Sequence, residues 1–294
     1  MPYQDGTPSL LTWSSHPDGK IEREERAVDT EDIGKLAQPG GGPGSTQHLA
    51  RLAGTTMPES IPDVIRRLAA IHEYASGTSM LRDDDGIAAF TRLYHIITTR
   101  IGNMVDSGEF RDPAFLIRLD LEFAERYLRA LRTYAEDMHR TPGVWRLLFD
   151  NRSDPRIAPV NFAVAGVNAH INFDLSCALV ATWKHVTPDG DGPDSAQFYD
   201  YRLINDVFEQ EMDPLREELG SFLSRGPDDA IWDRTANWVS DLVIRFTRDL
   251  AWDEAKRVWD RGADDKVMQA SEEKLDTIAS FVGERLLRAP ILPV

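Results

Sequence analysis

The sequence has a single cysteine, Cys177, and comparatively little positive charge. The first excludes an intramolecular disulfide, and the second disfavours binding to polyanions. One cysteine cannot form an intramolecular disulfide, and within an apolar run we expect a buried, inert thiol. Lys and Arg number 33 against 49 Asp and Glu, a formal net charge of −16. Since phosphate backbones and anionic lipid headgroups repel such a chain, we expect neither nucleic acid nor a membrane as a partner.

Several common catalytic signatures are also missing from the sequence. It contains no Gly-x-Ser-x-Gly elbow, no Gly-x-x-x-x-Gly-Lys phosphate loop, no strand-associated dinucleotide fingerprint and no His-Glu-x-x-His. The usual hydrolase, ATPase and dehydrogenase interpretations therefore lose most of their support. The opening residues, Met1 to Gly6, lack the basic start and apolar stretch of a secretory signal, so we expect a cytoplasmic location.

Helical periodicity is the main feature that the sequence does contain. With 294 residues, 41% of them hydrophobic, the chain can bury a large core. Apolar residues recur at spacings of three and four after helix-start signals at Ser60, at Asp84 or Asp85, and at Asp112-Pro113. Later helical patterns cover about 195–219, 228–261 and 264–287, and convincing strands are absent. We therefore predict an all-α fold, with residues 59–294 forming a single multi-helix domain.

Residues 1–58 differ in composition from the rest of the chain. They are rich in Gly, Pro, Ser, Thr and charge, most densely in Gln38 to Gly44, and show little periodicity. We interpret this segment as a flexible, largely disordered N-terminal arm. The alternative is that Leu10, Leu11 and Trp13 dock on the helical domain.

The segment from Pro159 to Val186 is apolar on nearly all sides, as expected of a buried central helix surrounded by others. Its length is also that of a membrane span. However, it is interrupted by polar residues that hydrocarbon tolerates poorly without partners: Asn161, Asn168, His170, Asn172 and Asp174. A helix buried in protein is the better interpretation.

The polar residues of this helix are the strongest candidates for chemistry. At 100° per residue, His170 and Asp174 lie one turn apart on one side, whereas the asparagines gather on the opposite side. One explanation is structural: a buried network in which Asp174 holds His170 in one tautomer. The other places the pair at the floor of a pocket, where it ligates a metal or transfers protons.

A metal site requires at least a third ligand from another helix. Asp120 is a candidate because it lies on the apolar face of its helix, and the alternative is a salt bridge to Arg92, Arg118 or Arg245. His95, at the border of an apolar stripe, is a second candidate. Together with His170 and Asp174 these residues form the predicted metal set, for a divalent ion such as zinc.

The run from Ala165 to Leu175, Ala-Gly-Val-Asn-Ala-His-Ile-Asn-Phe-Asp-Leu, resembles the hallmark of a bacterial and fungal family, domain of unknown function 5995. Other segments are similar in the same order: Phe90 to Tyr94, Asp112-Pro113 with Leu119-Asp120, and Ile204-Asn205. The resemblance covers approximately residues 60 to 260. It implies a helical fold and brings no activity with it, and it singles out four positions: Asn168, His170, Asn172 and Asp174.

These observations support two functional hypotheses. The first is an enzyme acting on a small organic molecule between helices, as a hydrolase, lyase or cyclase/isomerase in small-molecule biosynthesis. His170 would be the base or metal ligand, Asp174 would orient it, and Asn168 and Asn172 would organise the helix from its other side. The second hypothesis is a non-catalytic helical binding or interaction protein whose polar network is structural. The two differ in whether the pair opens onto a cavity with further polar groups.

Overall fold

The computed structural model describes residues 9–15, 21–27, 45–77, 85–187, 193–207 and 241–288. For the two N-terminal segments and for 241–246 it describes the backbone alone. Parts of the helices predicted over 195–219 and 228–261 lie outside these residues. The chain divides into two units, residues 1–45 and 46–294.

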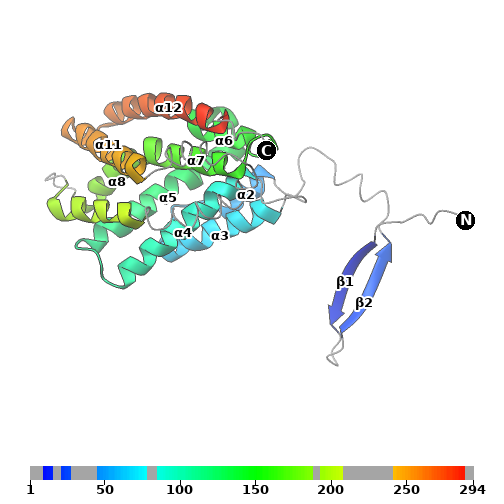
Figure 1. Cartoon of the computed structure of the whole chain (residues 1–294). Helices are drawn as coiled ribbons and strands as arrows, with labels where there is room; N and C mark the ends of the chain where they lie inside the picture. The colour runs from blue at the N-terminus through cyan, green and yellow to red at the C-terminus, as the bar shows by residue number, and fades with distance from the viewer. Residues whose placement is uncertain are drawn as a thin grey trace, which may run out of the picture. The chain divides into compact units, whose positions relative to one another are not determined.

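The second unit is all-helical in its described residues, which confirms the predicted fold class (Figure 1). Its helices are α2 (Thr46–Leu52), α3 (Ile61–Gly77), α4 (Gly86–Asp106), α5 (Pro113–Glu136), α6 (Gly143–Asn151), α7 (Pro159–Ala169), α8 (Leu175–Val186), α11 (Asp241–Asp260) and α12 (Asp265–Arg288). A 3-10 turn, η1, covers Met138–Arg140, a π-helical turn, η2, covers His170–Asp174, and a further helical segment covers 195–207. The helical unit therefore begins at Thr46, earlier than the boundary predicted at 59.

The helix starts follow from local side-chain chemistry. Asp85 caps α4 by accepting hydrogen bonds from the backbone N–H groups of Ile87 and Ala88. Asp112 caps α5 through the N–H of Phe115, with Pro113 in the first turn. Ser60 accepts from the N–H of Asp63 at the start of α3. Each cap satisfies an N–H that the first turn leaves without an intrahelical partner, as predicted at all three sites.

The predicted central helix is the run α7–η2–α8, from Pro159 to Val186. Among the described residues it is the one helix with the length and composition to cross a membrane, but 83% of its apolar window is buried inside the protein. Helices α4, α5, α6, α11 and α12 all contact this run. At Gly166, a Cβ would lie 2.3 Å from Cδ2 of Phe90, so the close approach of α7 to α4 requires glycine.

Buried side chains form two apolar clusters that meet at the central helix. One cluster includes Phe90, Tyr94, Trp145 and Phe162, and the other includes Leu119, Trp183 and Trp252. The α4 helix contributes to both clusters because it is apolar over a wide face. A polar group on the central helix at the junction of these clusters is surrounded by apolar side chains.

The N-terminal unit contains structure that the sequence analysis did not predict. Strands β1 (Ser9–Ser15) and β2 (Ile21–Ala27) pair in antiparallel register, with Trp13 opposite Arg23 (Figure 1). The sequence analysis found no convincing strands and did not predict this hairpin. Alternation is weak in both strands, and pairing of a hairpin depends on cross-strand contacts that one strand's sequence does not reveal.

Candidate functional site

The centre of the candidate site is the π-helical turn η2, which carries His170 and Asp174 at its two ends. Its signature is the hydrogen bond from the N–H of Leu175 to the carbonyl of His170, five residues earlier. A π turn inside an α-helix is uncommon and is frequently found at functional sites. The widened turn leaves Nδ1 of His170 3.1 Å from Oδ2 of Asp174.

Asp174 is buried and held by three side chains at once. Its Oδ1 accepts a hydrogen bond from Nε of Arg126 at 3.0 Å, and its Oδ2 accepts one from Nε1 of Trp145 at 2.9 Å. Arg126 in turn donates to Glu272 of α12 at 2.9 Å. Because both carboxylate oxygens are engaged, Asp174 orients His170 and has little freedom to take another ligand.

The hydrogen-bond pattern assigns the tautomer of His170. Asp174 accepts from two groups that can only donate, so Nδ1 of His170 carries the proton and Nε2 bears a lone pair. Burial lowers the pKa of His170, and the hydrogen bond to Asp174 offsets part of that effect. The imidazole is therefore neutral at pH 7. Its Nε2 is buried and has no hydrogen-bond partner among the described residues.

This nitrogen belongs to a ring that lines a mostly apolar cavity of about 50 Å³ between the helices. The cavity has room for a few water molecules or one small organic group. Its polar members other than His170 are Tyr94, Asp120 and Arg248. The Arg248 guanidinium donates to Oδ1 of Asn205 at 2.7 Å and to the Tyr201 carbonyl at 3.0 Å, and these two hydrogen bonds hold the guanidinium in place.

Asp120 shares this cavity with His170 and is the second group with unusual electrostatics. Burial raises its pKa to about 7, and its Oδ2 has no hydrogen-bond partner among the described residues. Of the arginines proposed as its partners, Arg118 pairs with Glu122, Arg92 is exposed, and the Arg245 side chain lies outside the described residues. Near neutral pH a substantial fraction of Asp120 is thus a neutral carboxylic acid that can donate a hydrogen bond.

Tyr94 adds a third polar group at the same place. Its ring centroid lies 4.5 Å from that of His170 in an edge-on arrangement. Burial raises its pKa well above the ordinary value, and the nearby carboxyl groups of Asp120 and Asp174 add to the shift. The Tyr94 hydroxyl is consequently protonated, buried and without a hydrogen bond of normal geometry in the described part of the chain.

The four predicted metal ligands do not come together. His170 and Asp174 form a pair and Asp120 lines the cavity beside His170, but His95 does not line it and is only half-buried on α4. Burial and the neighbouring His72 lower the pKa of His95. Within the described residues, no three His, Cys, Asp or Glu side chains are arranged to hold a metal ion. The donor geometry therefore does not support a zinc site built from this set.

The asparagines of the central helix do not line the cavity, and two of them bind α12. Asn161 donates to the carbonyl of Leu286 at 2.7 Å, and Asn168 donates to that of Ala279 at 2.9 Å. Asn172 donates to Oδ1 of Asn168. None of these side chains lines the cavity. Among residues predicted to be catalytic, Asn168 thus connects the central helix to α12, and Asn172 supports Asn168 from the next turn of the same helix.

Several site residues were not predicted from the sequence: Tyr94, Phe123, Arg126 and Trp145. Phe123 stacks on the imidazole of His170, and Arg126 and Trp145 bind Asp174. A partial signal exists for Arg126, which lies three residues after Phe123 and so on the inward side of α5. An arginine at such a position requires a buried acid. Cys177, as predicted, is buried, and burial raises the pKa of its thiol to about 11.

Fold and site together define an all-α protein whose central helix carries a buried histidine–aspartate pair beside an apolar cavity. The chain belongs to the family of unknown function DUF5995, whose model matches residues 61–289. This match extends beyond the approximately 60–260 covered by the resemblance of individual segments. No curated protein and no solved structure matches the chain.

Proposed function

We propose that this protein is an enzyme that transfers protons on a small, mostly apolar organic molecule held in the cavity at His170. The observation that carries the proposal is the lone pair on Nε2 of His170, which is buried at the cavity without a partner among the described residues. A buried polar atom left unsatisfied costs about 1–3 kcal/mol, which a purely structural network would avoid.

The roles of the groups follow from their protonation states. Neutral His170, oriented by Asp174, is the general base, and it takes a proton from a carbon next to a carbonyl group. Asp120, whose pKa burial raises to about 7, is the acid that hydrogen-bonds to the carbonyl oxygen as negative charge develops there. Returning the proton at another position completes an isomerisation. If the carbanion instead attacks a second carbonyl carbon of the same molecule, the ring bond forms as that C=O π bond opens, and the proton on His170 passes to its oxygen to complete a cyclisation.

The cavity favours such chemistry because its lining is mostly apolar and its volume is small. Exclusion of water strengthens hydrogen bonds to a developing enolate and keeps it from being quenched. Small-molecule biosynthesis in the cytoplasm, by isomerisation, cyclisation or elimination, is the setting that we propose. Metal-assisted hydrolysis has no comparable support, because the candidate ligands do not meet.

A non-catalytic binding protein is the second candidate, and one observation favours it. Asp174 is fully paired with Arg126, Trp145 and His170, as in a network that serves the fold alone. In that case the role of His170 would be limited to its hydrogen bond with Asp174, and the cavity would only hold an apolar ligand. The Asp120 carboxyl in the same cavity, whose Oδ2 has no partner in the described residues, argues against this candidate, since burying a carboxyl group without a partner is costly and does nothing to bind an apolar molecule.

Deuterium exchange tests the proposal without knowledge of the natural substrate. The full chain is incubated in D₂O with a panel of small ketones, aldehydes and enones, and loss of the α-proton signals is followed by ¹H NMR. We expect catalysed exchange of at least one compound, reduced at least ~100-fold in His170→Asn and at least ~10-fold in Asp120→Asn.

The matched control is His95→Asn, which alters a half-buried histidine outside the cavity and should exchange at the wild-type rate. Circular dichroism checks that each variant is folded. Exchange that is absent in the wild type, or equally fast in folded His170→Asn, would leave the binding protein as the better description.

A further inference from the structure

A second and larger hollow is lined by Asp174, the hydrogen-bond partner of His170. It is a cleft of about 510 Å³, a size ordinary for a metabolite site, with Arg126, Asp174 and Cys177 among its lining residues. It is bounded by α5, η1, α8 and α12, and its lining is more polar than that of the His170 cavity. We call it the Arg126 cleft.

Three exposed cations line this cleft: Arg129 of α5, Arg140 of η1 and Lys184 of α8. No ion pair involves any of them within the described part of the chain. Lys184 also lies in the last turn of α8, where a positive charge interacts favourably with the helix dipole. That explanation does not extend to Arg129, which lies in the middle of its helix.

The acids of the cleft are mostly neutralised by other partners. Glu122 pairs with Arg118, Glu125 pairs with Arg132, and Glu272 pairs with Arg126. Arg126 also binds Asp174, so this one arginine serves two carboxylates. Among the lining acids this leaves Asp265, in the first turn of α12, without an ion pair in the described residues. With Arg118 and Arg132 counted as partners, six cations lie in or beside the cleft against its five lining acids, an excess of one positive charge in a chain whose formal net charge is −16.

We infer that the Arg126 cleft is a binding site for a small polyanion bearing phosphate or carboxylate groups. Arg129, Arg140 and Lys184 come from three different elements and meet at one cleft, so they can surround one ligand. Guanidinium groups match both phosphate and carboxylate oxygens in a two-pronged geometry. The negative charge of the rest of the protein repels anions elsewhere, so an anion is favoured at these three exposed cations. The inference does not depend on the proton transfer proposed at His170.

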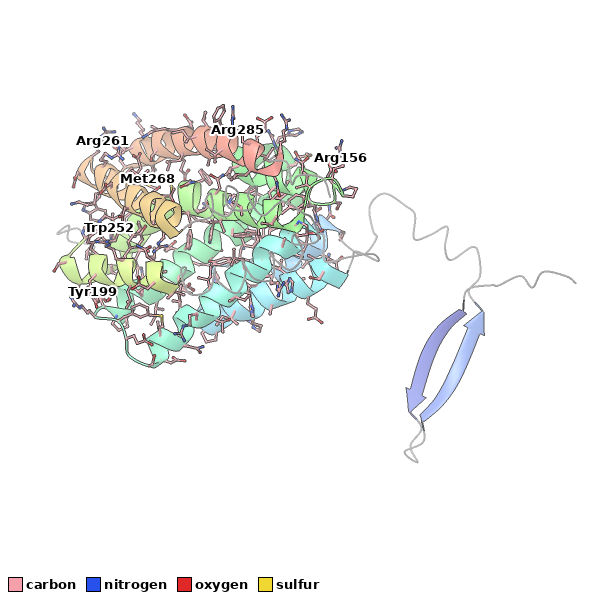
Figure 2. All side chains as sticks on the ribbon, in the orientation of Figure 1. Arg156, Tyr199, Trp252, Arg261, Met268 and Arg285 are labelled. Carbon is pink, nitrogen blue, oxygen red and sulfur yellow. The ribbon has the colours of Figure 1, made fainter. Side chains whose placement is uncertain are left out.

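Isothermal titration calorimetry of the full chain at low ionic strength tests this inference, with inorganic phosphate, pyrophosphate and citrate as probes. The test variant is the triple substitution Arg129→Gln, Arg140→Gln and Lys184→Gln. Its matched control is the triple substitution Arg100→Gln, Lys256→Gln and Arg261→Gln, which removes the same charge from exposed positions outside the cleft. Figure 2 labels Arg261 at the turn between α11 and α12.

We expect saturable one-to-one binding of at least one probe to the wild type and to the control variant. The cleft variant should bind at least ~10-fold more weakly, because three charge-assisted contacts are removed. Tighter binding of pyrophosphate would assign a phosphate-bearing ligand, and tighter binding of citrate would assign a polycarboxylate. No saturable binding of any probe at millimolar concentration, or equal weakening in both variants, would overturn the inference.

Discussion

The imidazole of His170 stacks on the ring of Phe123, with ring centroids 3.4 Å apart and ring planes inclined by 9°. Phe123 is half-buried on α5, and it covers one face of the histidine whose Nε2 has no partner among the described residues. The stacked ring is therefore part of the desolvation that keeps the imidazole neutral.

Replacing Phe123 by alanine should raise the pKa of His170 toward its ordinary value of 6.5, because water then reaches the ring and stabilises the charged form. NMR titration of the histidine ring signals measures this shift. Phe281→Ala is the control, since that side chain is 58% exposed and should leave the His170 pKa unchanged. An unaltered pKa in Phe123→Ala would show that burial by other groups is sufficient.

Asp120→Asn should change the pH dependence of stability. The pKa of Asp120 is about 7 in the folded protein against 3.8 as its ordinary value, so folding favours the protonated form. Its contribution to stability is fully present below pH 3.8 and is lost as the pH rises through about 7. At 1.36 kcal/mol for each pKa unit, the wild type loses up to about 4 kcal/mol relative to Asp120→Asn between about pH 4 and 8.

Urea denaturation of both proteins across this range gives the difference in unfolding free energy. Asp260→Asn, at an exposed position, serves as a control whose difference from the wild type should vary little with pH. A pH-independent difference for Asp120→Asn would contradict the raised pKa.

Asn168→Ala should lower the free energy of unfolding by about 1–3 kcal/mol, because Asn172 and the carbonyl of Ala279 each lose a partner. Urea denaturation measures this loss, and Asn103→Ala, at an exposed position, should stay within about 0.5 kcal/mol. Deuterium exchange by the folded variant should remain near the wild-type rate. A large loss of exchange with unchanged stability would instead make Asn168 part of the chemistry.

The helix starts and the central helix were predictable from the sequence for one reason. Capping by Asp85 and Asp112 and the apolar character of 159–186 depend on interactions within a few residues. The four-residue spacing of His170 and Asp174 likewise predicted that both lie on one side of a helix. The β1–β2 hairpin was missed because its pairing needs cross-strand contacts between weakly patterned segments.

The sequence by itself thus determined the helical class, the buried central helix and the pairing of its histidine with its aspartate, since these follow from backbone geometry. Only the tertiary structure decided what surrounds them. It placed Arg126 and Trp145 on Asp174, Phe123 on His170 and the asparagines on α12. The physical reason is that helix faces of similar polarity can pack in many ways, and the contacts of the whole core select one.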